Sequence, residues 1–303
     1  MTIWDNIETL LSSQCGPSTI VGYQRDCNSY LRWAKEQGKE PLDSQTLLSW
    51  RDDMSLHTTL SPNTINRYLS SIKRVVLEAR RHKLIDRDTA LDFQDVTNVK
   101  VRSLKSRLKN ARTRIAPADM RRLCEAPDTS TLIGLRDHAM LLTLASSGGR
   151  ASEVASLTLD QIRPTEDGKH YFIEINGKTD IAARDAHLSA EAHTAIGAWL
   201  EARNAKFQGI ATNSIFTSLE GNRHAGSQIS ETTVWRIVKR YAGDLGIKNI
   251  KPHDFRRFVG TQIAKKKDGL RKAQKALGHK DIQTTAKHYI LDDLEAGETE
   301  NMF

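Results

Sequence analysis

The sequence contains few cysteines and no long apolar run. Its 303 residues include three cysteines, Cys15, Cys27 and Cys124, which form no CxxC pair. An odd, widely spaced set argues against a disulfide framework or a zinc site and fits a reducing compartment. The longest apolar stretch, 139–145, is far too short to span a bilayer. The first five residues lack the pattern of a secretory signal, so we expect a soluble intracellular protein with no membrane partner.

Basic residues outnumber acidic ones. Lys and Arg total 45 against 37 Asp and Glu, which gives a formal net charge of +8. Such a charge suits a polyanionic partner, although many basic proteins bind no nucleic acid, and charge alone leaves both interpretations open. The chain is 38% hydrophobic, and its length is typical of about two domains that each bury a core.

Residues 1–99 are predicted to form a small helical domain. Apolar residues recur at helical spacing over 20–34. Ser61 is a good N-cap, Pro62 follows at the first helical position, and the apolar residues of 65–79 then trace one face. The polar face of that helix carries the candidate DNA contacts Asn63, Asn66, Arg67, Lys73 and Arg74. The alternative is an ordinary solvated face.

The segment 100–114 contains seven basic residues and no acidic one: Lys100, Arg102, Lys105, Arg107, Lys109, Arg112 and Arg114. A self-repelling segment of this kind suits an extended linker lying along a phosphate backbone, where each neutralised phosphate releases counterions. An ordinary solvated linker is the alternative. We take Lys105, Arg107, Lys109 and Arg112 as candidate DNA contacts.

Residues 115–303 are predicted to form a second, mainly helical domain. An apolar helix around 135–145 runs into Gly148 and Gly149, which permit a tight turn before Arg150, and Ser152 is expected to cap the next helix. Further helices are expected over 189–203, 231–241, 252–265, 269–276 and 282–290.

A small β-hairpin is predicted inside this second domain. Residues 171–178 alternate apolar and polar side chains and include Asn176-Gly177, a strong hairpin-turn dipeptide. We therefore expect Lys178 at the tip of a hairpin or just beyond it.

Six polar residues of the second domain supply the groups needed to attack a phosphodiester without a metal or another cofactor. They are Arg150, Lys178, His253, Arg256, His279 and Tyr289. The reacting phosphate gains negative charge on its non-bridging oxygens, and a guanidinium stays charged and grips two oxygens at once, which suits Arg150 and Arg256. His253 lies three residues before Arg256 and shares its helix face. Tyr289 needs nearby cations to attack, because a free phenol has a pKa of ~10.

The sequence around these residues resembles the conserved motifs of the tyrosine recombinases, or phage-type integrases. The matching segments are Gly-Gly-Arg-Ala-Ser-Glu-Val at 148–154, Asn-Gly-Lys at 176–178, His-Asp-Phe-Arg at 253–256, Leu-Gly-His at 277–279 and Thr-Thr-Ala-Lys-His-Tyr at 284–289. The resemblance runs from about residue 115 to 291, and the preceding bundle is similar to the core-binding domain of the family. It implies a mainly α fold with a small sheet in the catalytic domain, and two domains closing as a C-shaped clamp on DNA.

The resemblance also implies a reaction. Tyr289 would form a 3′-phosphotyrosyl link and free a 5′-hydroxyl, Lys178 would protonate that leaving oxygen, and His279 would contact the phosphate. Strands would be cleaved and rejoined without metal or ATP, for integration, excision or resolution. The implied partners are double-stranded DNA with paired half-sites and further copies of the chain, a dimer on each site and a tetramer in synapsis. The implied location is the cytoplasm of a prokaryotic cell or its mobile element, associated with the nucleoid.

The chain departs from the family pattern at three places. His288 occupies the position that the nucleophile has in many members, the hairpin segment up to Arg184 lacks a second lysine, and Arg257 stands where histidine is common. We take Arg257 as a further candidate DNA contact. The acidic segment after Tyr289 is expected either to pack on a neighbouring protomer or to fray.

Three alternatives remain open on sequence alone. The chain could be a DNA-binding or regulatory protein with a catalytically inert recombinase fold, or an enzyme like the type IB topoisomerases or telomere resolvases. It could also bind DNA through charge alone, without sequence preference. Taken singly, each candidate has a structural explanation too, and Arg150 could simply pair with Glu153.

Overall fold

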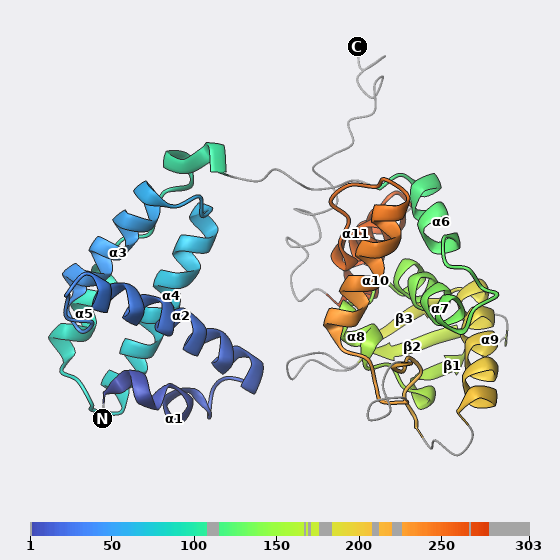
Figure 1. The fold of residues 1–303 in the computed structure, drawn as a ribbon, viewed down its shortest axis with the longest axis horizontal. Helices are drawn as coiled ribbons and strands as arrows, with labels where there is room; N and C mark the ends of the chain where they lie inside the picture. Colours follow the sequence, from blue (N-terminus) through green and yellow to red (C-terminus); the bar gives the residue numbers. More distant parts are fainter. Residues whose placement is uncertain are drawn as a thin grey trace, which may run out of the picture. The chain divides into compact units, whose positions relative to one another are not determined.

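The chain folds into two compact units, Met1–Ala111 and Arg112–Phe303. The computed structural model describes residues 2–107, 115–166, 168, 171–175, 184–207, 212–219, 226–266 and 268–278. Figure 1 shows the helices and strands of the two units. Each unit buries its own apolar cluster. Within the described ranges, no helix combines the length and the apolar character that crossing a bilayer requires.

The described residues of the first unit form helices joined by short connections, with no strand among them. Its elements are η1 (Ile3–Asn6), α1 (Ile7–Leu11), α2 (Pro17–Glu36), α3 (Ser44–His57), α4 (Pro62–Arg81), α5 (Arg87–Asp95) and η2 (Val101–Arg107). The central helix is α4, which contacts α1, α2, α3 and α5. It begins as predicted, since the Ser61 hydroxyl accepts a hydrogen bond from the backbone N–H of Thr64 at 3.3 Å and Pro62 takes the first helical position.

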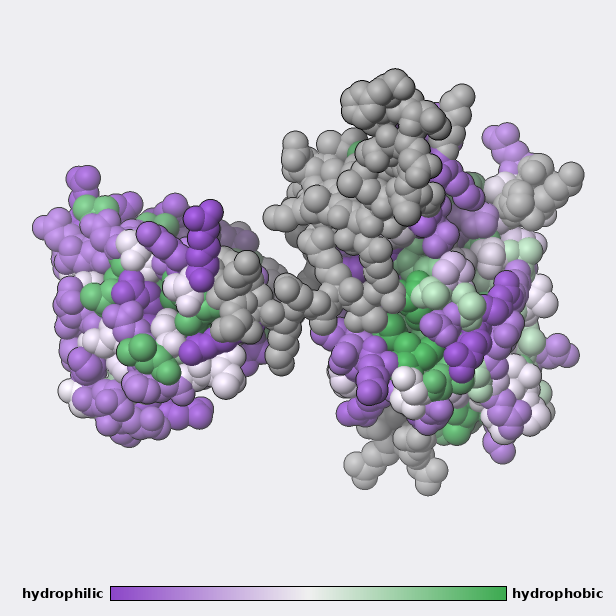
Figure 2. Space-filling model, turned by 90° about the horizontal axis from the view of Figure 1, so that it is seen from above, coloured by the Kyte–Doolittle hydropathy of each residue, from purple (hydrophilic) through white to green (hydrophobic). Residues whose placement is uncertain are grey.

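The apolar side chains of the first unit lie mostly inside it. Ile65, Leu69 and Ile72 of α4 are fully buried in one cluster with Tyr30 of α2. The face of this unit seen in Figure 2 is mainly hydrophilic, with apolar residues in small groups. The predicted helical bundle is thus confirmed for α2 and α4, and its core is self-contained.

The predicted extended linker is wrong over its first half. Residues Val101–Arg107 form the 3-10 helix η2, which contacts α4, and Leu104 packs against the apolar cluster of the first unit. Leu104 is half-buried there and has non-helical backbone angles, so two short 3-10 turns meet at it. The remainder of the segment, 108–114, lies outside the described residues.

The second unit combines helices with a small antiparallel sheet. Its helices are α6 (Pro117–Glu125), α7 (Leu132–Ser147), α8 (Ala151–Ala155), η3 (Leu159–Gln161), α9 (Ala190–Lys206), α10 (Glu231–Asp244), α11 (Pro252–Ala264) and α12 (Gly269–Leu277). The strands β1 (Ile162–Pro164), β2 (Tyr171–Ile175) and β3 (Arg184–Leu188) lie in the order β1-β2-β3. The helix predicted over 282–290 lies outside the described residues.

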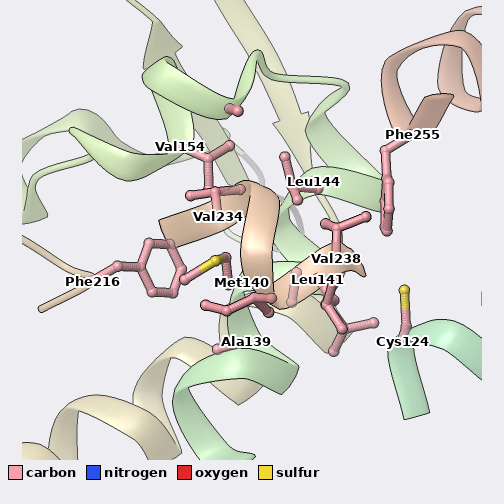
Figure 3. Packing of buried hydrophobic residues seen from close by; sticks show 14 of the residues in the cluster. Cys124, Ala139, Met140, Leu141, Leu144, Val154, Phe216, Val234, Val238 and Phe255 are labelled. Carbon is pink, nitrogen blue, oxygen red and sulfur yellow. The ribbon is translucent and has the colours of Figure 1, made fainter. Parts of the chain in front are cut away.

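The apolar helix α7 runs through the core of the second unit. It contacts α9, α10, α11 and β3. Figure 3 shows Met140, Leu141 and Leu144 of α7 among Val238 of α10 and Phe255 of α11, all within one buried cluster. Because α7 is packed from several sides, the turn that follows its last residue is held in a fixed place.

The predicted hairpin exists, but its register differs from that of a two-residue turn at Asn176-Gly177. Ile175 pairs with Arg184 in the antiparallel β2–β3 ladder. A two-residue turn at Asn176-Gly177 would have paired Ile175 with Lys178 instead. Lys178 itself lies outside the described residues.

Candidate active site

The turn before Arg150 depends on a glycine in the left-handed conformation. Gly148 ends α7 with φ of 60°. A Cβ atom at Gly148 would lie 3.0 Å from Cδ2 of Leu277 and 3.2 Å from Val259. A side chain here would therefore be strained and crowded at once, and glycine lets the turn pack closely on α11 and α12.

Arg150 itself takes the N-cap position of α8, so the prediction of Ser152 as the cap is wrong. The carboxylate of Glu153 supplies the capping interaction, with Oε2 accepting the backbone N–H of Arg150 at 2.7 Å. Glu153 also holds the side chain, since Nη1 of Arg150 lies 2.5 Å from Oε1. The ion pair between Arg150 and Glu153, which the sequence left open as an alternative to a catalytic role, is thus present. The Arg150 side chain remains 44% exposed, which leaves room for a phosphate beside it.

Arg256 joins three segments at the centre of the site. Its side chain is buried, with the residue 1% exposed. Nη1 donates to the carbonyl oxygen of Gly148 at 2.9 Å, and Nη2 donates to the carbonyl oxygen of Leu277 at the end of α12. One guanidinium therefore ties α11 to the turn that carries Arg150 and to the residue before Gly278.

His253 lies three residues before Arg256 in the first turn of α11 and is exposed. Pro252 occupies the first helical position there, as predicted. The unpaired N–H groups of a helix start favour an anion, so this end of α11 suits a phosphate. In the second turn of α11, the guanidinium of Arg257 lies 3.2 Å from the carboxylate of Asp254.

Arg184, at the first position of β3, is a residue of this site that sequence reasoning missed. Its Nη2 lies 3.1 Å from Oε2 of Glu153, and its Nη1 donates to the carbonyl oxygen of Ala276. Burial lowers the pKa of Arg184, and the neighbouring carboxylate raises it in part. The sequence offers one signal for this residue, namely that Arg184 directly precedes the alternating apolar positions of β3.

Glu153 is a buried carboxylate held between two arginines. Burial by itself raises the pKa of Glu153, but the backbone N–H of Arg150, the charge of Arg184 and the Arg150 side chain together outweigh it. The net result is a pKa below the ordinary value. Glu153 therefore stays ionised and keeps Arg150 in place.

The structure brings together half of the predicted catalytic residues. Arg256 donates to the carbonyl oxygen of Gly148, two residues before Arg150, and His253 lies on the same helix as Arg256. The other three, Lys178, His279 and Tyr289, lie outside the described residues.

Known proteins are similar to this chain in sequence and in fold. Residues 113–295 match the model of the phage integrase family. The chain belongs to the phage integrase family. It is 30% identical to tyrosine recombinase XerD of Neisseria meningitidis over 287 residues, which is 92% of this chain and 89% of the relative. It is 25% identical to tyrosine recombinase XerD of Lacticaseibacillus casei, over 88% of this chain and 86% of the relative.

Solved structures show the same fold. A XerH site-specific recombinase bound to palindromic difH substrate gives a TM-score of 0.71 at 17% identity, covering 96% of this chain and 82% of that one. A lambda integrase dimer bound to a COC′ core site gives 0.65 at 15% identity, covering 99% and 98%. The predicted family, the mainly α fold with a small sheet, and the enzyme class of tyrosine site-specific recombinases are confirmed.

The DNA contacts predicted on α4 of this recombinase are mostly engaged within the first unit. Asn66 exchanges two hydrogen bonds with the backbone of Val99, at 3.0 and 2.8 Å. The ammonium of Lys73 donates to the carbonyl oxygens of Gln94, at 3.0 Å, and Val96. These two residues bind α4 to the last turn of α5 and to the segment that follows it.

The two arginines on this face also have partners inside the unit. Arg67 pairs with the buried carboxylate of Asp26 on α2. Arg74 donates to the side-chain oxygen of Gln14 and lies 3.1 Å from the carboxylate of Glu78. Asn63 is exposed. Of the remaining candidates, Lys105 and Arg107 lie in η2, whereas Lys109 and Arg112 lie outside the described residues.

Proposed function

We propose that the protein is a site-specific DNA recombinase that cleaves and rejoins strands through a covalent 3′-phosphotyrosyl intermediate on Tyr289. The hydrogen bond from Arg256 to the Gly148 carbonyl is the observation that carries this proposal. This bond ties α11 to the turn two residues before Arg150, and it supports a phosphate site to which both arginines contribute. Two guanidinium groups near one phosphate would stabilise the negative charge that a phosphodiester gains when it is attacked.

In the proposed reaction, the phenolic oxygen of Tyr289 attacks the phosphorus and its proton passes to His253. The bond from phosphorus to the 5′-oxygen breaks, and Lys178 gives that oxygen a proton. Arg150, held by Glu153, and His279 bind the non-bridging oxygens. Arg256 fixes the turn of Arg150 and adds positive charge close to the phosphate. Rejoining reverses these steps with a different 5′-hydroxyl. The phosphotyrosyl bond conserves the energy of the broken linkage, so the reaction needs neither ATP nor a metal.

The proposed partners are double-stranded DNA with paired half-sites and further copies of the chain, as a dimer on each site and a tetramer in synapsis. Residues 1–99 would form the DNA-binding domain, 100–114 a basic connection and 115–303 the catalytic domain. Among the candidates on α4, Asn63 and Arg67 are the exposed ones, so we propose these two first. The proposed location is the cytoplasm, on the nucleoid or a mobile element.

A suicide-substrate assay tests this function. Nicked duplexes carrying the sequence that flanks the gene are incubated with wild type and Tyr289→Phe in EDTA and run on a denaturing gel. The proposal predicts a covalent protein-DNA band with wild type alone. Tight binding of the same duplexes by wild type without a band would favour a catalytically inert DNA-binding protein. A band of equal strength from Tyr289→Phe would exclude Tyr289 as the nucleophile.

A further inference from the structure

Arg184 connects two parts of the active site that lie far apart in the sequence. One side of its guanidinium meets the Glu153 carboxylate at 3.1 Å, and the other donates to the carbonyl oxygen of Ala276 in the last turn of α12. The side chain is only 13% exposed. A single buried cation therefore joins the carboxylate behind Arg150 to the end of α12.

Two arginines donate hydrogen bonds to the last backbone carbonyl groups of α12. The last carbonyl groups of a helix lack partners within the helix and carry partial negative charge. Arg184 takes the carbonyl of Ala276, and Arg256 takes that of Leu277. Gly278 follows at a φ of 64°, and the next residue in the sequence is His279.

Gly278 fits closely against Arg184. A Cβ atom at Gly278 would lie 2.5 Å from Cδ of Arg184, closer than unbonded carbon atoms approach. The guanidinium beyond that carbon is hydrogen-bonded through both Nη atoms, so the Arg184 side chain cannot move away without breaking one of these bonds. The glycine is thus matched to the arginine as well as to the left-handed turn.

We propose that Arg184 is a positioning residue for strand cleavage. It holds Glu153, and through Glu153 the guanidinium of Arg150, in a fixed relation to the end of α12 from which the chain continues to His279. This inference rests on the proposed function. Arg184 acts through other residues, because both of its Nη groups are bonded within the protein.

The test is single-turnover cleavage of the suicide substrate at saturating DNA by Arg184→Gln and Arg184→Lys. We expect Arg184→Gln to lower the cleavage rate constant about 10- to 100-fold, since a misplacement of about 1 Å has such an effect. DNA affinity and the fraction of enzyme that finally forms adduct should stay close to wild type. The cleavage rate constant of Arg184→Lys should lie between those of Arg184→Gln and wild type. The lysine ammonium keeps the charge but lacks the planar guanidinium that reaches both partners.

Arg203→Gln is the matched control. Arg203 on α9 is also a buried arginine, and it donates to the backbone carbonyls of Ser214 at 2.6 Å and Ile215 at 3.2 Å without touching Glu153 or α12. Its loss should lower the melting temperature and leave the rate constant unchanged.

Two results separate this inference from the function on which it rests. If Arg184→Gln cleaves at the wild-type rate and loses only stability, as Arg203→Gln should, the positioning role is overturned while the recombinase function stands. If wild type forms no adduct on DNA that it binds, the proposed function fails and the inference fails with it.

Discussion

Replacing Arg256 with glutamine should destabilise the second unit by about 2–4 kcal/mol. The guanidinium is buried and donates to the carbonyl oxygens of Gly148 and Leu277. Hydrogen bonds to a charged group contribute roughly 1.5–3 kcal/mol each, and the shorter amide of glutamine leaves at least one carbonyl buried without its donor. Removal of a desolvated charge offsets part of this loss.

Differential scanning calorimetry of the full chain measures the effect. For a unit of about this size each kcal/mol shifts the melting temperature by roughly 2–4 °C, so Arg256→Gln should lower it by about 5–15 °C. Arg257→Gln is the control on the same helix, because its guanidinium forms a more exposed pair with Asp254 at 3.2 Å. The Asp254 carboxylate keeps its hydrogen bond from the Lys251 backbone N–H after this change, so the control should lose less, about 1 kcal/mol, and melt roughly 2–4 °C below wild type. A shift for Arg256→Gln no larger than that of the control would refute the reasoning.

Three further predictions follow from the same contacts. Glu153→Gln should lose stability at neutral pH in urea unfolding, and its deficit should shrink as the pH falls below the ordinary carboxyl pKa of 4.5, because the pKa of Glu153 is lowered in the folded state. Gly278→Ala should shift the urea midpoint more than Gly246→Ala, since both glycines have positive φ but only Gly278 meets Arg184. Of the three cysteines, only Cys15 should react with a thiol reagent at about pH 8 before unfolding, because burial raises the pKa of the other two to about 12.

Local sequence signals predicted much of the fold. The Ser61 cap, the proline after it and the apolar face of α4 are encoded within a few residues, and all appear in the structure. The double glycine before Arg150 likewise predicted a tight turn, and Gly148 does adopt the left-handed conformation. Such signals succeed because backbone conformation and periodicity act over one or two helical turns.

Contacts between distant segments could not be predicted in this way. Arg184 meets Glu153 and Ala276, which lie 31 and 92 residues from it in the sequence. For the same reason, the partners of the polar residues on α4 could not be predicted, since Asp26 is 41 residues from Arg67. A buried partner and a DNA phosphate select the same polar side chains, and a single sequence does not distinguish the two.

The measurement that most directly tests the central claim is identification of the residue that carries the DNA. The adduct trapped on a nicked duplex is digested, and the peptide bearing the nucleotide is sequenced by mass spectrometry. The account predicts a phosphodiester on Tyr289, which is adjacent to His288 on the same peptide. Attachment to His288 or to any other residue would contradict the assignment of Tyr289 as the nucleophile.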